Sequence, residues 1–511
     1  MIDLDRLIEK LEEVRGDMLS LEQEYQQHLS EIHPDYKASA VNLLHYLALR
    51  KYDLREIQSD LSALGLSSVG HSERYTMRNI SNILRLLYLI KGEDPGKLKT
   101  QEGMYMGRPE SRLRLEENTA RLFGPEKNGH TRIMVTLPTD AADDKQFIRD
   151  LLSEEVEIFR INTSHDSPEV WERMIGNIRD AEREKGQRGM IYMDLAGPKI
   201  RTGNLPPRKT KKGKIKDGQI VLRIGDELII TREERIGCDA EIDEYDRVTT
   251  PAIISTTLPE VFDYVEEGER IWFDDGKIGG IIETVKPEQW HVRITQAHPE
   301  GSKLRGDKGI NLPDSDLQLP PLTEYDLETL PFIAKHADLV GYSFVQRAED
   351  VRGLQEKLEE LGRPDMGIVL KIETKHAFDE LPNLIFEAMK SPAIGIMVAR
   401  GDLAVELGWT RIAEVQEEIA WLCEAAHIPL IWATQILENQ AKTGLATRAE
   451  ITDAAAAVNA ECAMLNKGPY ITKAVKTLRS IDRRMHAHFE KKMGSLRPLH
   501  VATHYFKHHK P

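Results

Sequence analysis

The chain has 511 residues, which is too many for one compact core, so two to four domains are expected. Its formal net charge of −15, from 69 Lys and Arg against 84 Asp and Glu, argues against nucleic acid or anionic lipid as the main partner. Its three cysteines are isolated, its N-terminus lacks a signal-peptide profile, and no apolar run approaches the roughly 18 residues of a membrane span. We therefore expect a cytoplasmic protein without a disulfide framework, a zinc site or a membrane segment.

Residues 1–95 carry apolar side chains at helical spacing, as at Leu4, Ile8 and Leu11. Proline and small polar residues interrupt this pattern more than once, so a small bundle of several helices is predicted rather than one long coiled coil. Residues 96–130 are rich in Gly, Pro and charged side chains. That composition predicts a connector between the helical bundle and the next domain.

Residues 131–203 and 308–485 alternate short β-type runs with helical stretches. The expected strands are residues 132–137, 156–162, 189–194, 337–345, 366–373, 393–398, 429–434 and 462–465. Eight parallel strands predict an α/β fold, a closed (β/α)8 TIM barrel, with an open doubly wound sheet as the alternative. Residues 204–307 are rich in Gly and β-branched residues, which predicts an inserted all-β domain placed as a lid after the third strand. Residues 486–511 are expected to form a tail.

Two of the apolar strands end in charged residues, which is unusual for strands of a barrel. Lys371 and Glu373 end one strand, and Asp402 comes directly after the next. Burying these charges is unfavourable unless an opposite charge, a metal ion or an anion compensates them. Two carboxylates beside an ammonium group suit a hard divalent cation that holds an anionic substrate. A structural salt bridge inside the barrel is the alternative explanation for Lys371 and Glu373.

Six short segments, in chain order, carry a family resemblance. They are FRINTSH at 159–165, MDLAGPKIR at 193–201, KGINLP at 308–313, KIE at 371–373, ARGDL at 399–403 and ATQ at 433–435. In these segments the chain resembles pyruvate kinase, and the inserted domain is typical of that family. The predicted N-terminal helical domain lies outside the resemblance.

The resemblance implies transfer of a phosphoryl group from phosphoenolpyruvate to ADP, followed by protonation of the enolate to give pyruvate and ATP. Glu373 and Asp402 would hold Mg²⁺ or Mn²⁺, which hard oxygen ligands suit. Lys371 would neutralise charge on the bridging oxygen, and Arg160 would hold the phosphoryl oxygens with its planar guanidinium. For Arg160, pairing with a structural carboxylate is the alternative reading.

The resemblance also assigns residues to the substrate carboxylate and to proton transfer. The backbone N–H groups of Gly401 and Asp402, at the start of a helix, would bind the substrate carboxylate. Thr434, at the end of the seventh strand, would belong to the proton relay that reaches the enolate carbon. A threonine hydroxyl is a weak acid, so water must share that role. Ordinary β-propensity explains a threonine at this position equally well.

Lys199 is a departure from the family pattern with a physical meaning. Many relatives have a carboxylate at this position and use a bound K⁺ ion near the transferring phosphate. An ammonium group can take the place of that ion, and Asn162, Ser164 and Asp194 would then surround the Lys199 head group. The resemblance therefore implies turnover that does not require K⁺.

The nucleotide side of the resemblance is less complete. Arg201, His165 and Lys308 would contact the nucleotide, but the loops at 137–140 and 466–469 have lost the residues that relatives carry there. Two alternatives follow from these changes and from the barrel carboxylates. One is a metal-dependent 2-oxoacid aldolase, and the other is a regulatory protein that binds phosphoenolpyruvate without phosphoryl transfer.

Relatives add a regulatory domain where this chain is expected to have its tail. We expect regulation through such a domain to be absent. We also expect a homo-oligomer, with the N-terminal helical bundle supplying the contact that relatives make through their C-terminal domain.

Overall fold

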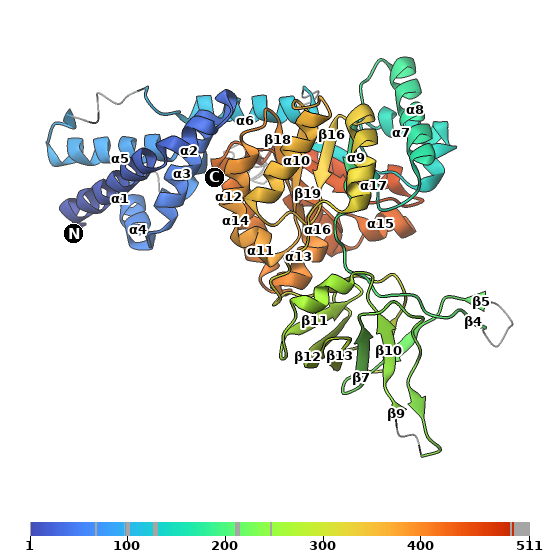
Figure 1. The fold of residues 1–511 in the computed structure, drawn as a ribbon. Coiled ribbons are helices and arrows are strands. Elements are labelled where there is room, and N and C mark those ends of the chain that lie inside the picture. The colour runs from blue at the N-terminus through green and yellow to red at the C-terminus, as the bar shows by residue number, and fades with distance from the viewer. Residues whose placement is uncertain are drawn as a thin grey trace, which may run out of the picture.

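The computed structural model describes residues 2–66, 69–96, 98, 103–125, 131–209, 215–245, 248–490 and 493–494. In this part of the chain, eight parallel strands pair into a closed barrel (Figure 1). In order around the barrel they are β1 (Arg132–Thr136), β2 (Ile158–Asn162), β3 (Met190–Asp194), β16 (Leu339–Tyr342), β17 (Gly367–Ile372), β18 (Ile394–Ala399), β19 (Leu430–Ala433) and β20 (Cys462–Leu465). The closed barrel confirms the predicted TIM-barrel fold and excludes the open doubly wound sheet.

Helices alternate with these strands and cover the outside of the barrel. They are α7 (Lys145–Ser153), α8 (Pro168–Lys185), α9 (Glu324–His336), α10 (Ala348–Glu360), α11 (Lys375–Asp379), α12 (Leu381–Ala388), α13 (Arg400–Leu407), α14 (Ile412–Ala425), α15 (Glu438–Thr443), α16 (Arg448–Ala456) and α17 (Ile471–His486). Capping residues mark where two of these helices begin. Asp144 caps α7 by accepting the backbone N–H of Phe147 at 2.9 Å, and Thr447 forms a capping box with Glu450 at the start of α16.

Between β3 and β16 the chain leaves the barrel and forms a six-stranded sheet. In order across the sheet its strands are β10 (Ala252–Ser255), β7 (Glu227–Thr231), β13 (Gln289–Gln296), β12 (Ile278–Lys286), β11 (Arg270–Phe273) and β15 (Ile310–Asn311). Three short pairs accompany it: β4 (Arg208–Lys209) with β5 (Ile215–Lys216), β6 (Ile220–Leu222) with β14 (Ser302–Leu304), and β8 (Glu241–Ile242) with β9 (Val248–Thr250).

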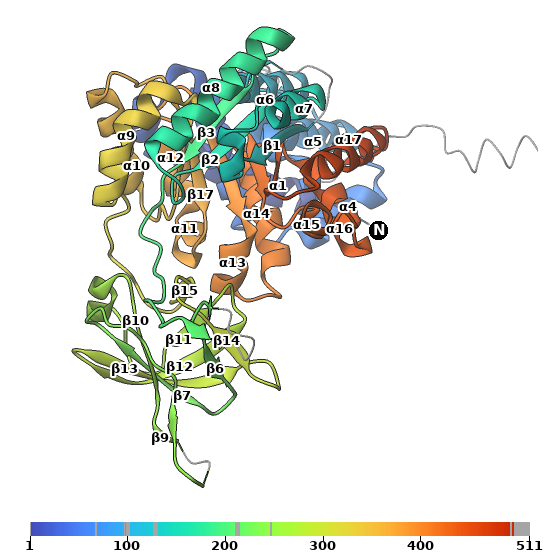
Figure 2. The ribbon, with the colours of Figure 1, turned by 90° about the vertical axis from the view of Figure 1, so that its right-hand side faces the viewer.

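The inserted sheet has a core of its own and covers one end of the barrel. In that core the ring of Trp290 stacks on Phe262, with centroids 4.1 Å apart. Figure 2 shows the sheet beyond the end of the barrel at which α11 and α13 lie. Because these helices follow β17 and β18, the inserted domain faces the carboxyl ends of the strands, which is where TIM barrels carry their active sites.

Five α-helices of the described residues come before residue 96. They are α1 (Leu4–Glu24), α2 (Gln26–Glu31), α3 (Lys37–Arg50), α4 (Arg55–Ala63) and α5 (Thr76–Lys91). The long helices α1, α3 and α5 pack against one another through the apolar stripe that the sequence predicts. Figure 1 shows the group beside the barrel at α12 and α14. Asn42 of α3 joins the two parts by donating to the carbonyl oxygen of Ala425 at 2.8 Å.

The segment expected to be a connector contains a further helix, α6 (Arg108–Phe123). Figure 1 shows α6 at the end of the barrel opposite the inserted sheet. Leu122 and Phe123, in its last turn, pack with side chains that fill the barrel interior. A Cβ atom at Gly367 or Gly395 would lie 2.8 or 2.5 Å from a methyl group of Leu122, so these two glycines give the helix room. Residues 108–123 therefore close the amino-terminal end of the barrel rather than only linking two domains.

The C-terminal part of the chain is described only in part. Two short strands, β21 (Phe489–Glu490) and β22 (Met493–Gly494), pair after α17, and residues 491, 492 and 495–511 of the predicted tail lie outside the described residues. Within the described ranges, every helix is too short or too polar to cross a bilayer. The division of the chain into domains at the predicted boundaries stays a prediction.

His427 is fully buried where the N-terminal helices meet the barrel. Its Nε2–H donates to the carbonyl oxygen of Arg74 at 2.8 Å, and its Nδ1 accepts from the hydroxyl of Ser39 at 3.1 Å. A ring that donates through one nitrogen and accepts through the other is neutral. Burial lowers the pKa of His427 from 6.5 to about 4.

The free energy of unfolding is expected to fall as the pH drops from about 6.5 toward 4, because the unfolded chain protonates this ring while the folded chain does not. The full effect corresponds to about 3 kcal/mol. Urea unfolding between pH 4.5 and 7.5 measures it, and His427→Gln should lose that pH-dependent part. His28→Gln, on the exposed surface of α2, is the matched control. A parental pH slope in the His427 variant would contradict the prediction.

Candidate active site

Charged side chains gather at the carboxyl ends of the barrel strands. Figure 2 shows that the inserted domain lies beyond this end of the barrel. Arg160 lies in β2, Asp194 ends β3, Lys371 lies near the end of β17, and Glu373 follows that strand. Asp402 lies in the first turn of α13, directly after β18. Strand-end position alone predicts that these side chains converge.

Asp194 is the buried centre of this group. It accepts hydrogen bonds from Arg160 Nε and from the Tyr192 hydroxyl, both at 2.6 Å, and Lys371 Nζ lies 3.7 Å from its Oδ2. Burial acts to raise the pKa of Asp194, but the charges of Arg160 and Lys371 outweigh burial and lower it. The ionised carboxylate therefore orients both cations. Arg160 is fixed further by donating to the hydroxyl of Thr136 at 2.9 Å.

Lys371 links this centre to Glu373. Its ammonium group donates to the hydroxyl of Ser343 at 2.6 Å and lies 3.1 Å from Glu373 Oε1. The other carboxylate oxygen of Glu373 accepts the backbone N–H of Phe344 at 2.7 Å. Burial raises the pKa of Glu373; Lys371 opposes that rise, and the negative charge of Asp402 adds to it. Glu373 and Asp402 are thus close enough to repel each other.

The chemistry around Glu373 and Asp402 fits a hard divalent cation. A cation between two carboxylates that repel each other in a buried site relieves that repulsion, and Mg²⁺ and Mn²⁺ both prefer oxygen ligands. Among the described residues there is no group of three or more His, Cys, Asp or Glu side chains that could hold a metal ion. The protein would therefore supply two carboxylates, leaving the other coordination positions to substrate oxygens and water.

Thr434 follows β19 with a φ of 65°, in the left-handed region where a β-branched residue is strained. Its hydroxyl oxygen accepts the backbone N–H of Gly401 at 3.0 Å, so the N–H that the resemblance assigns to the substrate carboxylate is engaged within the protein. Arg400 holds this turn by donating to the carbonyl oxygens of Ala433, at 3.0 Å, and Thr434. Asp453 of α16 balances the charge of Arg400, 2.9 Å from Nη2.

Lys199 has a different partner from the one predicted. Its ammonium group donates to Asp402 Oδ1 at 2.9 Å rather than lying among Asn162, Ser164 and Asp194. Asp194 is already paired with two cations, and Asn162 Oδ1 accepts the backbone N–H of Ser164 at 3.1 Å. Burial disfavours the Lys199 ammonium, but Asp402 outweighs burial and raises the pKa of Lys199. The structure thus places a fixed positive charge on one of the two candidate metal ligands.

A family model described as the barrel domain of pyruvate kinase matches residues 128–475. The chain belongs to the pyruvate kinase family. It is 32% identical over 359 residues to pyruvate kinase from Geobacillus stearothermophilus, an alignment that covers 69% of this chain and 56% of the relative. The Bacillus licheniformis enzyme is 31% identical over 361 residues, with 69% and 57% covered. The Thermotoga maritima enzyme is 31% identical over 380 residues, with 73% and 74% covered.

The family match covers the barrel and the inserted sheet but not the N-terminal helices. This chain spans little more than half the length of the G. stearothermophilus and B. licheniformis pyruvate kinases. The family match begins at residue 128, so α1 to α6 lie before it. The barrel and the inserted sheet therefore carry the relationship to pyruvate kinase.

Basic residues gather on the side of the barrel where the pyruvate kinase resemblance implies a nucleotide. Burial lowers the pKa of His165, and the nearby charges of Lys467 and Arg201 lower it further. Lys467 lies in the altered loop at 466–469, so this loop brings a cation to the same place. Lys308, the third residue expected to contact the nucleotide, is paired instead with the inserted domain. Its ammonium group lies 3.1 Å from Asp274.

Sequence reasoning missed several residues that organise the site, among them Tyr192, Thr136 and Ser343. Ser343 directly follows the last residue of β16, so the strand-end rule could have selected it. Arg400 and Asp453 are 53 positions apart, and no local pattern pairs them. Their contact is visible only once α13 and α16 are placed around the barrel.

Proposed function

We propose that the protein is a pyruvate kinase-type phosphotransferase that converts phosphoenolpyruvate and ADP to pyruvate and ATP, with Mg²⁺ or Mn²⁺. The observation that carries this proposal is the single network of Arg160, Lys371, Glu373 and Asp402 at the carboxyl end of the barrel. These charges suit a substrate that has both a carboxylate and a phosphoryl group. When bound by Glu373 and Asp402, a divalent ion supplies positive charge to the oxygens of the substrate.

The side chains of the network have separate tasks in the proposed reaction. The bond between phosphorus and the enol oxygen breaks as an oxygen of the ADP β-phosphate forms a bond to phosphorus. Arg160, oriented by Asp194, binds the oxygens of the moving phosphoryl group. Lys371 neutralises the charge that develops on the enol oxygen. The enolate then takes a proton at its methylene carbon, through water and the hydroxyl of Thr434.

An assay that couples pyruvate formation to a second enzyme tests the proposal directly. The assay contains phosphoenolpyruvate, Mg²⁺ and each nucleoside diphosphate in turn. Pyruvate that forms only in the presence of a diphosphate supports the kinase. Binding of phosphoenolpyruvate without pyruvate release favours the regulatory protein, and cleavage of a hydroxy-oxoacid favours the aldolase. Self-association stays a prediction, which light scattering tests.

Turnover is expected to be independent of K⁺, because the ammonium group of Lys199 already supplies a fixed positive charge beside Asp402. The expected result is equal rates in choline chloride and in potassium chloride. Lys199→Glu restores the carboxylate that many relatives carry, and its rate should rise about 10-fold when K⁺ is added. A strict requirement of the parent protein for K⁺ would contradict the prediction.

A further inference from the structure

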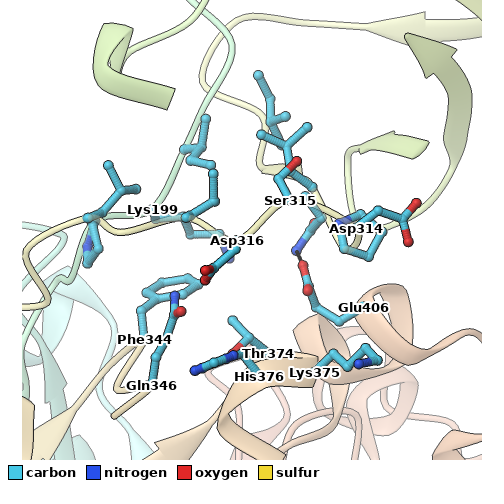
Figure 3. A pocket seen from close by; sticks show the side chains of 18 of the residues that line it. Lys199, Asp314, Ser315, Asp316, Phe344, Gln346, Thr374, Lys375, His376 and Glu406 are labelled. Carbon is cyan, nitrogen blue, oxygen red and sulfur yellow. Dashed lines mark hydrogen bonds between the residues drawn. The ribbon is translucent and has the colours of Figure 1, made fainter. Parts of the chain in front are cut away.

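A cavity of about 240 Å³ lies where the inserted domain rejoins the barrel. Figure 3 shows Asp314 and Ser315 on the side of the inserted domain and Thr374 and His376 on the side of the barrel. Glu406 reaches toward the chain of the inserted domain from α13. The cavity is therefore bounded by the segments whose relative position would change if the inserted domain moved.

Glu406 joins three structural elements at the edge of this cavity. It lies on α13, one helical turn after Asp402, and its side chain is buried. Its Oε1 accepts a hydrogen bond from the side-chain amide of Asn311 at 3.0 Å. The backbone N–H of Lys375, two residues after Glu373, is near enough to the Glu406 carboxylate to act to lower its pKa. One side chain thus contacts the inserted domain and both segments that carry the candidate metal ligands.

Asn311 connects Glu406 to the body of the inserted sheet. It ends β15 and pairs with Trp272 of β11, which is hydrogen-bonded in turn to β12. A movement of the sheet is therefore transmitted to the Asn311 amide without a flexible loop between them.

Holding a carboxyl group at this position is unfavourable. Burial raises the pKa of Glu406 to about 7, although the bond from Asn311 acts to lower it. An apolar side chain of similar size would fill the space without that penalty, but it could not accept the bond from Asn311 or interact with the backbone N–H of Lys375. The polar contacts thus explain why a carboxyl group stands here.

We propose that Glu406 is a positioning residue that couples the inserted domain to Asp402 and Glu373 through Asn311 and the backbone of Lys375. When the sheet is seated, the Asn311 bond holds α13 and the start of α11 at the spacing in which the two carboxylates bind a divalent cation. When the bond is lost, the carboxylates keep their charge but lose that spacing. The proposal rests on the metal site of the proposed function.

A second contact between the same two parts supplies a matched control. Asp316, five residues after Asn311, accepts from the guanidinium of Arg347 at 2.9 Å. Arg347 caps α10, which carries neither candidate metal ligand. Asp316→Asn therefore weakens a contact between the inserted domain and the barrel without disturbing α11 or α13.

The experiment measures Mn²⁺ binding to the full-length protein by electron paramagnetic resonance of the free ion, with and without oxalate. Asn311→Ala and Glu406→Ala are each expected to raise the dissociation constant about 10-fold. The double variant should bind no more weakly than Glu406→Ala alone, because Glu406→Ala already removes the bond from Asn311. Glu406→Gln keeps an acceptor for Asn311 and should restore most of the affinity. Asp316→Asn should bind Mn²⁺ as the parent does.

Several outcomes would overturn the proposal: parental Mn²⁺ affinity in Asn311→Ala, additive losses in the double variant, or an equal loss in Asp316→Asn. If Glu406→Ala does not fold, Asn311→Ala with Glu406→Gln still decides the question. The coupled assay separates this result from the proposed function. A parent that binds Mn²⁺ but makes no pyruvate refutes the phosphotransferase alone, whereas unchanged Mn²⁺ binding in an active Asn311 variant refutes the coupling alone.

Discussion

Phosphoryl transfer is expected to slow on the order of 10³-fold when Lys371 is replaced by methionine. The enol oxygen would then carry its developing charge without the ammonium group that Ser343, Glu373 and Asp194 hold in place. Methionine has a similar length, and Asp194 keeps its bond from Arg160, so the network loses one charge rather than its packing. The loss should therefore appear in kcat, with little change in KM for phosphoenolpyruvate.

Lys375→Met provides the matched control for this measurement. Lys375 lies four residues further along the chain, but its ammonium group pairs with Asp379, 2.7 Å away at the surface of α11. Its replacement should leave kcat near the parental value. A Lys371 variant that works as well as the parent would show that the ammonium group has no part in the chemistry.

Much of the fold follows from short-range features of the sequence. The strand β18 is apolar along its whole length and β17 is apolar except for Lys371, which is the pattern that parallel strands buried on both faces require. Helix α6 was missed for the opposite reason. Seven of its 16 residues are charged, and the two apolar side chains that seal the barrel, Leu122 and Phe123, come only in its last turn. Composition alone therefore does not distinguish a connector from this polar helix. The role of its last turn becomes clear only when the barrel interior that it covers is known.

The candidate site was predictable in position but not in pairing. Strand-end location brings Lys371, Glu373 and Asp402 to one end of the barrel, because parallel strands share a direction. Which cation pairs with which carboxylate depends on distances across the barrel that no spacing in the sequence encodes. Lys199 was expected near Asp194, but Asp194 is already paired, and Asp402 is the carboxylate that the ammonium group reaches.

Mn²⁺ binding is expected to weaken about 100-fold in Glu373→Gln and in Asp402→Asn, because an amide keeps the shape of each carboxylate but loses its charge. The same titration by electron paramagnetic resonance measures the loss, and phosphoryl transfer should fall in parallel. Asp379→Asn, an exposed carboxylate on α11, is the control and should bind Mn²⁺ as the parent does. Thermal unfolding of each variant shows whether it is folded.

The two variants are also expected to differ in stability, because each leaves a different lysine without one of its carboxylate partners. Glu373→Gln removes a buried carboxyl, and Lys371 keeps the hydroxyl of Ser343 and Asp194, 3.7 Å away, as partners, so this variant should lose less stability than Asp402→Asn. Asp402→Asn instead leaves the Lys199 ammonium without its partner, so it should lose stability as well as metal.

A crystal of the parent soaked with Mn²⁺ and oxalate should carry the ion between the two carboxylates. If that position is empty, or if both variants bind Mn²⁺ normally, the cation is held elsewhere and the proposed mechanism is wrong.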